Sequence, residues 1–119
     1  MKMKKPFYII AILSFVLHTL GLNANTPIIQ LGVEQGLSNN HVVSITQDKD
    51  GFLWFATEEG LNRFDGLHFN RYYEYNGDLS GNELNYVLAD PIEPVIWIAT
   101  QRDGLNKYNY ALDSIVIYK

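Results

Sequence analysis

The sequence predicts an all-β protein: two consecutive four-stranded antiparallel β-propeller blades of an incomplete propeller, after an N-terminal signal peptide. Three observations lead to this prediction. The chain of 119 residues contains nearly the same stretch twice, at a spacing that grows from 42 to 44 residues. Each copy holds short β-rich runs separated by turn signals such as Asp-Gly. No run has the 3.6-residue apolar period of a helical repeat, so four strands in each period of about 40 residues indicate a blade.

Residues 1–24 are typical of a secretory signal peptide. They begin with Lys2, Lys4 and Lys5, continue with an apolar run from Phe7 to Leu17, and end in small residues up to Ala24. The apolar run is shorter than the roughly 20 residues that cross a bilayer. We therefore expect export to the periplasm and cleavage, with a retained membrane anchor as the alternative, and membrane contact only through this segment.

Residues 25–36 contain a β-rich run, Ile28 to Val33, followed by a turn. A similar run and turn precede the second copy of the repeat, but here the run has no blade of its own. We expect it to be an N-terminal outer strand, which in a closed propeller completes the last blade and closes the ring.

Residues 37–78 form the first predicted blade. Its strands are expected at Val42 to Gln47, Phe52 to Thr57, Leu61 to Phe64 and Leu67 to Tyr75. The second of these runs is apolar on both faces, as in a strand covered from two sides. Asp-Gly at residues 65–66 predicts a hairpin, because Gly accepts the positive φ of a tight turn.

Residues 79–119 form the second predicted blade, aligned on "LSNNHVVSITQD" at Leu37 and "LSGNELNYVLAD" at Leu79. Extra residues of the second copy fall in turns, where a repeated unit tolerates insertions. The structural repeat positions of the first copy are Asp48, Gly51, Trp54, Ala56, Thr57, Gly60, Leu61, Asn62 and Phe64. Those of the second copy are Asp90, Trp97, Ala99, Thr100, Gly104, Leu105, Asn106 and Tyr108.

The stretch "GLSNNHVVSITQDKDGFLWFATEEGLNRFDGLHF" resembles the two-component regulator propeller repeat, which occurs in periplasmic sensor regions of hybrid two-component histidine kinases of Bacteroidetes. The second copy is a looser match, with Pro91 and Pro94 where the family usually has an Asp-x-x-Gly turn. The resemblance implies a parent protein, anchored in the inner membrane, that senses oligosaccharides released from polysaccharides and controls transcription of the genes for their degradation.

No phosphoacceptor histidine box or ATP-binding segment is recognisable, so we expect an N-terminal fragment of such a sensor and not an enzyme. A stand-alone exported module that self-associates through its open blade edges is the first alternative. A propeller lyase or glycosidase is the second, although no catalytic constellation is visible. Without Lys2, Lys4 and Lys5, six of the nine basic residues remain against thirteen acidic ones, which argues against nucleic acid as a partner.

Trp54 and Trp97 could stack on sugars, but their repeated place in an apolar strand favours a packing role. Arg71, Tyr72, Tyr73 and Tyr75 are weak candidates for ligand binding, because they cluster on an outer strand, where cross-strand pairing is the alternative. Arg63 and Lys107 share a repeat position that could form a salt bridge between blades or face a ligand.

No catalytic, cofactor or metal site is predicted. Asp48 and Asp50 fail the calcium-loop pattern, which needs Gly at its sixth position, and are expected to form a turn. His41 and His68 lack metal-ligand spacing, and the sequence has no Cys to join them. Glu58 and Glu59 are expected to be solvated turn residues.

Overall fold

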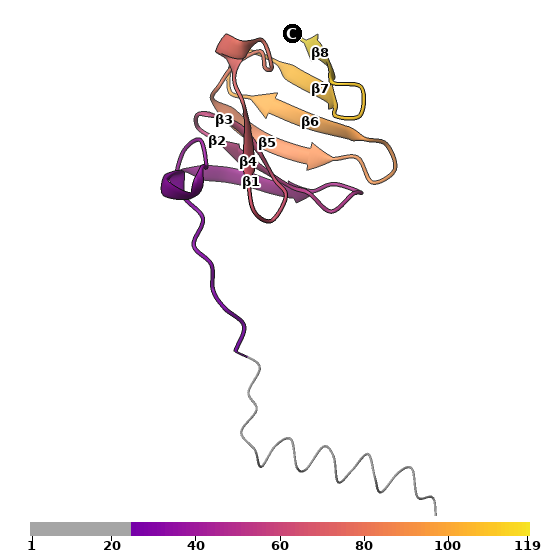
Figure 1. The fold of residues 1–119 in the computed structure, drawn as a ribbon. Coiled ribbons are helices and arrows are strands. Elements are labelled where there is room, and N and C mark those ends of the chain that lie inside the picture. The colour runs from indigo at the N-terminus through magenta and orange to yellow at the C-terminus, as the bar shows by residue number, and fades with distance from the viewer. Residues whose placement is uncertain (1–24) are drawn as a thin grey trace, which may run out of the picture.

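The computed structural model describes residues 25–119, which fold into two four-stranded antiparallel sheets (Figure 1). The predicted signal peptide, with His18, lies outside the described residues. The first sheet has the order β1-β2-β3-β4 and the second β5-β6-β7-β8, so every strand pairs with its neighbour in sequence. The strands are β1 (Val42–Gln47), β2 (Leu53–Thr57), β3 (Gly60–Phe64), β4 (Phe69–Tyr72), β5 (Leu84–Ala89), β6 (Val95–Thr100), β7 (Leu105–Asn109) and β8 (Ser114–Tyr118). This arrangement confirms the predicted pair of propeller blades.

The repeated polar residues hold equivalent positions in the two sheets. Asn62 of β3 is fully buried, accepts a hydrogen bond from the backbone N of Ser38 (2.8 Å) and donates to its Oγ (2.7 Å). Asn106 of β7 makes the same pair of bonds to Ser80, at 3.0 and 2.9 Å. In each sheet the amide therefore ties the segment that leads into the blade to the third strand, which explains why Leu-Ser and Gly-Leu-Asn recur together.

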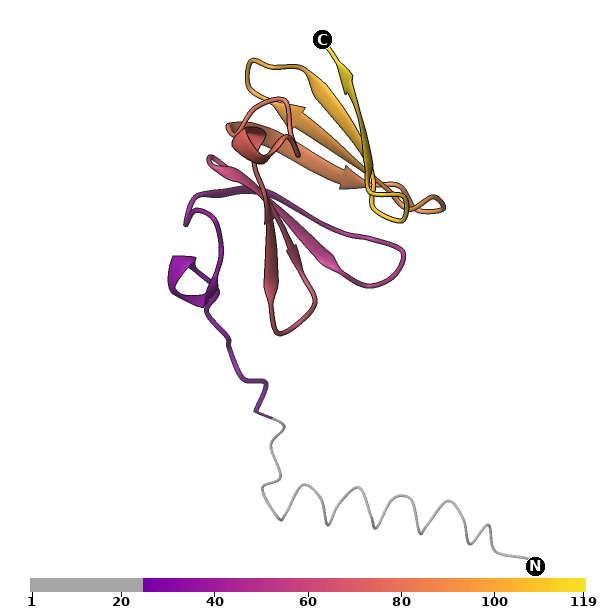
Figure 2. The same cartoon turned by 45° about the horizontal axis from the view of Figure 1, so that its top comes forward.

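The main hydrophobic core lies between the two sheets. Figure 2 shows the sheets side by side, and strands β1 and β2 of the first contact β5 of the second. Trp54 and Ala56 of the first sheet are buried with the apolar residues Leu61, Leu79, Leu84, Val87, Ile96 and Ile98. Ser44 Oγ accepts from the backbone N of Val87 (3.1 Å), and Thr46 Oγ1 accepts from that of Ala89 (3.1 Å).

Trp97 differs from its repeat partner in its burial, although the sequence predicts a packing role for both indoles. Trp54 is fully buried, whereas Trp97 is half-buried. Both lie on the same side of their sheets. The first sheet turns this side toward the second sheet, but the second sheet turns it away from the first, so no blade within residues 25–119 covers Trp97.

Two strand predictions need correction. Residues 25–31 form no strand, and Val33–Gln35 forms a 3-10 turn, η1, so the outer strand predicted at Ile28 to Val33 is not formed. A ring-closing strand needs an open blade edge as its partner, and in Figure 1 this segment instead leads away from both sheets. Strand β4 is also shorter than predicted: it ends at Tyr72, and η2 (Glu74–Asn76) follows.

Within residues 25–119, no helix has the length and apolarity needed to cross a membrane.

Candidate functional site

The four aromatic and basic residues singled out from the sequence line one surface groove, which we call the tyrosine groove. Its volume is about 660 Å³. The lining residues come from the whole of β4, from η2 and its flanks, and from the β7–β8 hairpin: Phe69, Asn70, Arg71, Tyr72, Tyr73, Tyr75, Asn76, Asp78, Tyr108 and Asp113. The groove therefore spans both blades. Sequence patterns could not identify Tyr108 and Asp113 as lining residues, because these two residues belong to the other repeat.

The turn that follows β4 sets the geometry of this groove. The backbone N of Tyr73 donates to the Asp78 carboxylate (3.3 Å), and that of Glu74 donates to Asn82 Oδ1 (2.7 Å). These bonds turn the chain out of the sheet and stack the rings of Tyr73 and Tyr75, whose centroids lie 4.7 Å apart. Tyr75 is 72% exposed, so its outer face is free to stack on a flat ligand.

Tyr72 has a different role from its two neighbours. Its ring centroid lies 5.7 Å from that of Trp54 and 5.5 Å from that of Tyr108, so it packs in the seam between the sheets. The Tyr108 hydroxyl donates to Asp113 Oδ1 (2.8 Å). Burial, followed by this bond to Asp113, raises the pKa of Tyr108 strongly, and the pKa of Tyr75 is raised by desolvation and by Tyr73. Both phenols are therefore neutral hydrogen-bonding groups at neutral pH.

A second concave site, the junction pocket, lies where the β2–β3 and β6–β7 turns meet the segments that lead into the blades. Its volume is about 460 Å³, and it is lined by Asn39, Glu58, Glu59, Asn82, Glu83 and Gln101. The backbone N of Gly60 donates to the carbonyl of the lining residue Asn82 (2.8 Å), which joins the first blade to the segment that leads into the second. The carboxylates and amides here suit hydrogen bonding to a polar, uncharged or cationic ligand.

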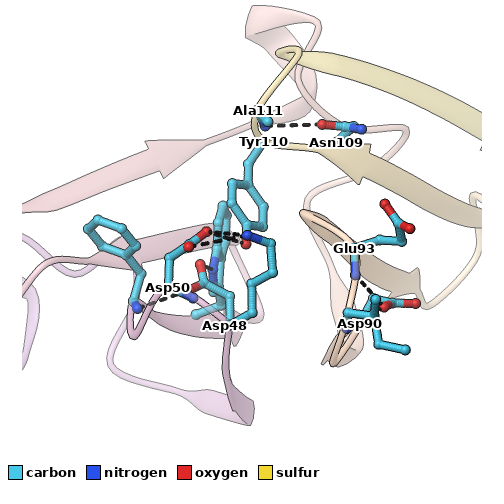
Figure 3. A network of polar contacts seen from close by, with 11 residues as sticks. Asp48, Asp50, Asp90, Glu93, Asn109, Tyr110 and Ala111 are labelled. Carbon is cyan, nitrogen blue, oxygen red and sulfur yellow. Dashed lines mark hydrogen bonds and ion pairs between the residues drawn. The ribbon is translucent and has the colours of Figure 1, made fainter.

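The Asp-Lys-Asp-Gly turn is part of an interblade network rather than an isolated solvated turn (Figure 3). Asp48 is 5% exposed, and its Oδ2 accepts from Trp54 Nε1 at 2.7 Å. Asp50 accepts from the Tyr110 hydroxyl of the second blade (2.9 Å). The sequence correctly predicted a turn here, but the burial of Asp48 and the contact across the blades depend on long-range packing.

The repeated basic residues lie over aromatic rings. The Arg63 guanidinium is 3.8 Å from the centroid of Phe52 and 5.6 Å from that of Tyr110, so it links the blades by cation–π contact. Lys107 Nζ lies 5.3 Å from the ring of Trp97. His41 Nδ1 is 3.0 Å from Glu58, and His68 Nδ1 is 3.7 Å from Asp65. Over residues 25–119, no cluster of three or more His, Asp or Glu side chains could hold a metal ion.

The comparisons with known proteins agree with the repeat analysis. The family described as two component regulator propeller matches residues 36–59. A curated protein, histidine kinase P4 of Formosa agariphila, is 54% identical over 37 residues, which are 31% of this chain and 3% of that protein. The resemblance to two-component regulator propeller repeats is therefore confirmed.

Two solved structures have the same fold. The extracellular domain of the hybrid two-component system BT3049 from B. thetaiotaomicron is 61% identical, with a TM-score of 0.72, over 76% of this chain and 13% of that chain. The extracellular domain of the one-component system BT4673 from the same organism is 28% identical, with a TM-score of 0.61, over 78% and 14%. The chain thus spans a small part of each relative, and the part that it matches is extracellular in both.

Proposed function

We propose that this chain supplies two blades of a periplasmic β-propeller sensor in a hybrid two-component system, whose complete form detects a polysaccharide-derived oligosaccharide and controls transcription. The observation that carries this proposal is the 61% identity to the extracellular domain of such a system over 76% of the chain. In this role the chain binds or transmits a signal and is not itself catalytic.

The tyrosine groove supports the choice of a carbohydrate. Sugars present apolar C–H faces and hydroxyl groups, so a receptor needs an exposed aromatic face beside hydrogen-bonding side chains. Tyr75 offers the ring, and Arg71, Asn76 and Asp78 offer donors and acceptors within the same groove. The chain also lacks the excess of basic groups that a nucleic acid would need.

The experiment is calorimetric titration of the chain with oligosaccharides released from a panel of polysaccharides, followed by the variant Tyr75→Ala. We expect an oligosaccharide to bind and Tyr75→Ala to weaken it by roughly 2- to 10-fold, the value of one aromatic contact. Ile92→Ala is the matched control, because Ile92 is 78% exposed and lies in the β5–β6 turn, outside the groove.

An unchanged affinity in Tyr75→Ala would show that the ligand binds outside the tyrosine groove. Glu58→Gln in the junction pocket would then be the next variant to titrate. Turnover of a polysaccharide by the purified chain would contradict the proposal and favour the lyase or glycosidase alternative.

A further inference from the structure

Arg63 lines a small pocket next to the tyrosine groove, which we call the Arg63 pocket. Its volume is about 230 Å³, and it is lined by Phe52, Arg63, Asp65, His68 and Asn70. Asn70 of β4 also lines the tyrosine groove, so the two sites adjoin along the outer strand of the first blade.

The Arg63 side chain lies on the side of the first sheet that faces the second blade. In the ladder between β2 and β3 it is opposite Trp54, whose ring contacts Tyr108 and Tyr110 of the second blade. The surroundings of Arg63 are therefore formed by the two blades of this chain.

Three aromatic rings hold the Arg63 guanidinium in place. Its Cζ lies 3.8 Å from the ring centroid of Phe52 and 5.6 Å from those of Trp54 and Tyr110. Its Nε is buried and has no hydrogen-bond partner within residues 25–119. Because the rings and not polar partners fix the guanidinium, its terminal Nη groups remain available to the oxygen atoms of a ligand.

Two carboxylates lie near Arg63, and both have other partners. Asp50 accepts from the Tyr110 hydroxyl at 2.9 Å. Asp65, which lines the pocket, accepts from the backbone N of His68 at 2.6 Å. In the part of the chain that the structure describes, neither carboxylate forms a salt bridge with Arg63. Arg63 therefore carries a positive charge that no ion pair of residues 25–119 neutralises.

We propose that Arg63 binds a carboxylate of the ligand, so that the oligosaccharide is an acidic one with a uronic acid residue. This inference rests on the proposed function and names the class of sugar. A planar guanidinium binds a carboxylate through two parallel hydrogen bonds, which a neutral hydroxyl group cannot reproduce. The amide of Asn70, opposite Arg63 in the ladder between β3 and β4, offers a further donor in the same pocket.

The negative charge of the whole chain has little effect on this contact. Repulsion between exposed charges is largely screened beyond about 8 Å at physiological ionic strength. One carboxylate needs one guanidinium, whereas a nucleic acid needs many basic groups. The Asp65 carboxylate, in contrast, lines the pocket itself and weakens the attraction for an anion.

Calorimetric titration of the chain with oligomers of galacturonic, glucuronic and mannuronic acid, each beside its methyl ester, tests the proposal. The ester has the same sugar backbone without the charge. We expect one of the acids to bind roughly 10-fold more tightly than its ester, the value of a hydrogen-bonded pair with charged partners. Arg63→Gln should remove this difference. Arg102→Gln is the matched control, because Arg102 is exposed in the β6–β7 turn and lines neither site.

Asp65→Asn is a second variant, which leaves the aromatic contacts of Arg63 intact. The Asn side chain keeps an oxygen that can accept from the backbone N of His68, while the negative charge is lost. We expect this variant to bind the acid roughly 2- to 5-fold more tightly and the ester with unchanged affinity.

Equal affinity of the natural chain for every acid and its ester would overturn the proposal. So would a preference for the acid that persists in Arg63→Gln, with its fold verified by circular dichroism. Binding of neutral oligosaccharides without binding of any oligouronide would overturn this inference and leave the proposed function standing. If no oligosaccharide binds, acidic or neutral, the proposed function itself fails.

Discussion

Asp48 organises the first hairpin through three donors. Its Oδ1 accepts from the backbone N of Asp50 (2.9 Å) and of Phe52 (3.0 Å), and its Oδ2 accepts from the indole of Trp54. One carboxylate therefore satisfies the turn and orients the largest side chain of the core. At the equivalent position Asp90 accepts from the backbone N of Ile92 and Glu93, at 2.8 Å each. These bonds hold the proline-containing turn of the second blade.

The contact between Asp50 and Tyr110 gives a pH-dependent contribution to stability. The Tyr110 hydroxyl, followed by Lys49, lowers the pKa of Asp50, so the folded state favours the carboxylate. This contribution is present above the ordinary Asp pKa of about 4 and is lost as the pH falls through the lowered folded-state pKa. We expect Tyr110→Phe to lower the thermal midpoint at neutral pH, and the difference from the natural chain to shrink in acid.

Thermal unfolding followed by circular dichroism at several pH values measures this difference. Tyr86→Phe, at an exposed ring, is the control and should leave the pH profile unchanged. A difference between Tyr110→Phe and the natural chain that is constant from neutral to acid pH would contradict the assignment.

At the scale of elements, the β2–β3 turn couples the first blade to the tyrosine groove. Gly60 has φ +99°, and a Cβ there would lie 2.8 Å from the Tyr72 carbonyl and 2.8 Å from the Tyr73 ring. Gly51, in the β1–β2 turn, has a similar φ of +93°, with no atom within 4 Å of such a Cβ. A comparison of Ala variants at the two glycines therefore separates the cost of the positive φ from the cost of the steric contact.

We expect Gly51→Ala to cost about 1 kcal/mol, from the left-handed backbone alone. Gly60→Ala should cost roughly 1–3 kcal/mol more, because the methyl group forces β4 and Tyr73 to move. Urea unfolding of both variants measures the difference. Equal decreases in the free energy of unfolding would show that β4 and Tyr73 move to accommodate the methyl group at no cost.

At the scale of the whole molecule, the two sheets stabilise each other through Trp54. Its ring contacts Tyr72 of its own sheet and Tyr108 and Tyr110 of the second, with centroids 5.7 to 6.1 Å apart. The buried core cluster takes residues from both sheets and lies between them. We therefore expect the blades to unfold in one cooperative transition, since neither sheet retains its buried face without the other.

The matched pair Trp54→Ala and Trp97→Ala tests this view. Trp54→Ala should cost about 3–5 kcal/mol, the usual range for a buried Trp. Trp97→Ala should cost clearly less, because its indole is half-buried and touches mainly Tyr118 and Lys107. Urea unfolding measures both free energies of unfolding. Similar decreases for the two variants would contradict the difference in burial between Trp54 and Trp97.

The sequence by itself determined the two blades, their strand order and most of their turns, because turn residues and short apolar runs act locally and the repeat doubles the signal. It also singled out Arg71, Tyr72, Tyr73 and Tyr75, which the structure gathers in one groove. It did not predict the burial of Asp48, the end of β4 at Tyr72 or the contribution of Tyr108 and Asp113 to that groove. These features depend on contacts between residues far apart in the chain.

Only the tertiary structure separated Trp54 from Trp97. The two residues are equivalent in the repeat, so no local pattern can tell them apart. Their burial depends on which face of each sheet has a neighbour, and that is a property of how the sheets pack. The same physical reason leaves Ile45 57% exposed while its repeat partner Val87, which lies in the contact between the sheets, is 1% exposed.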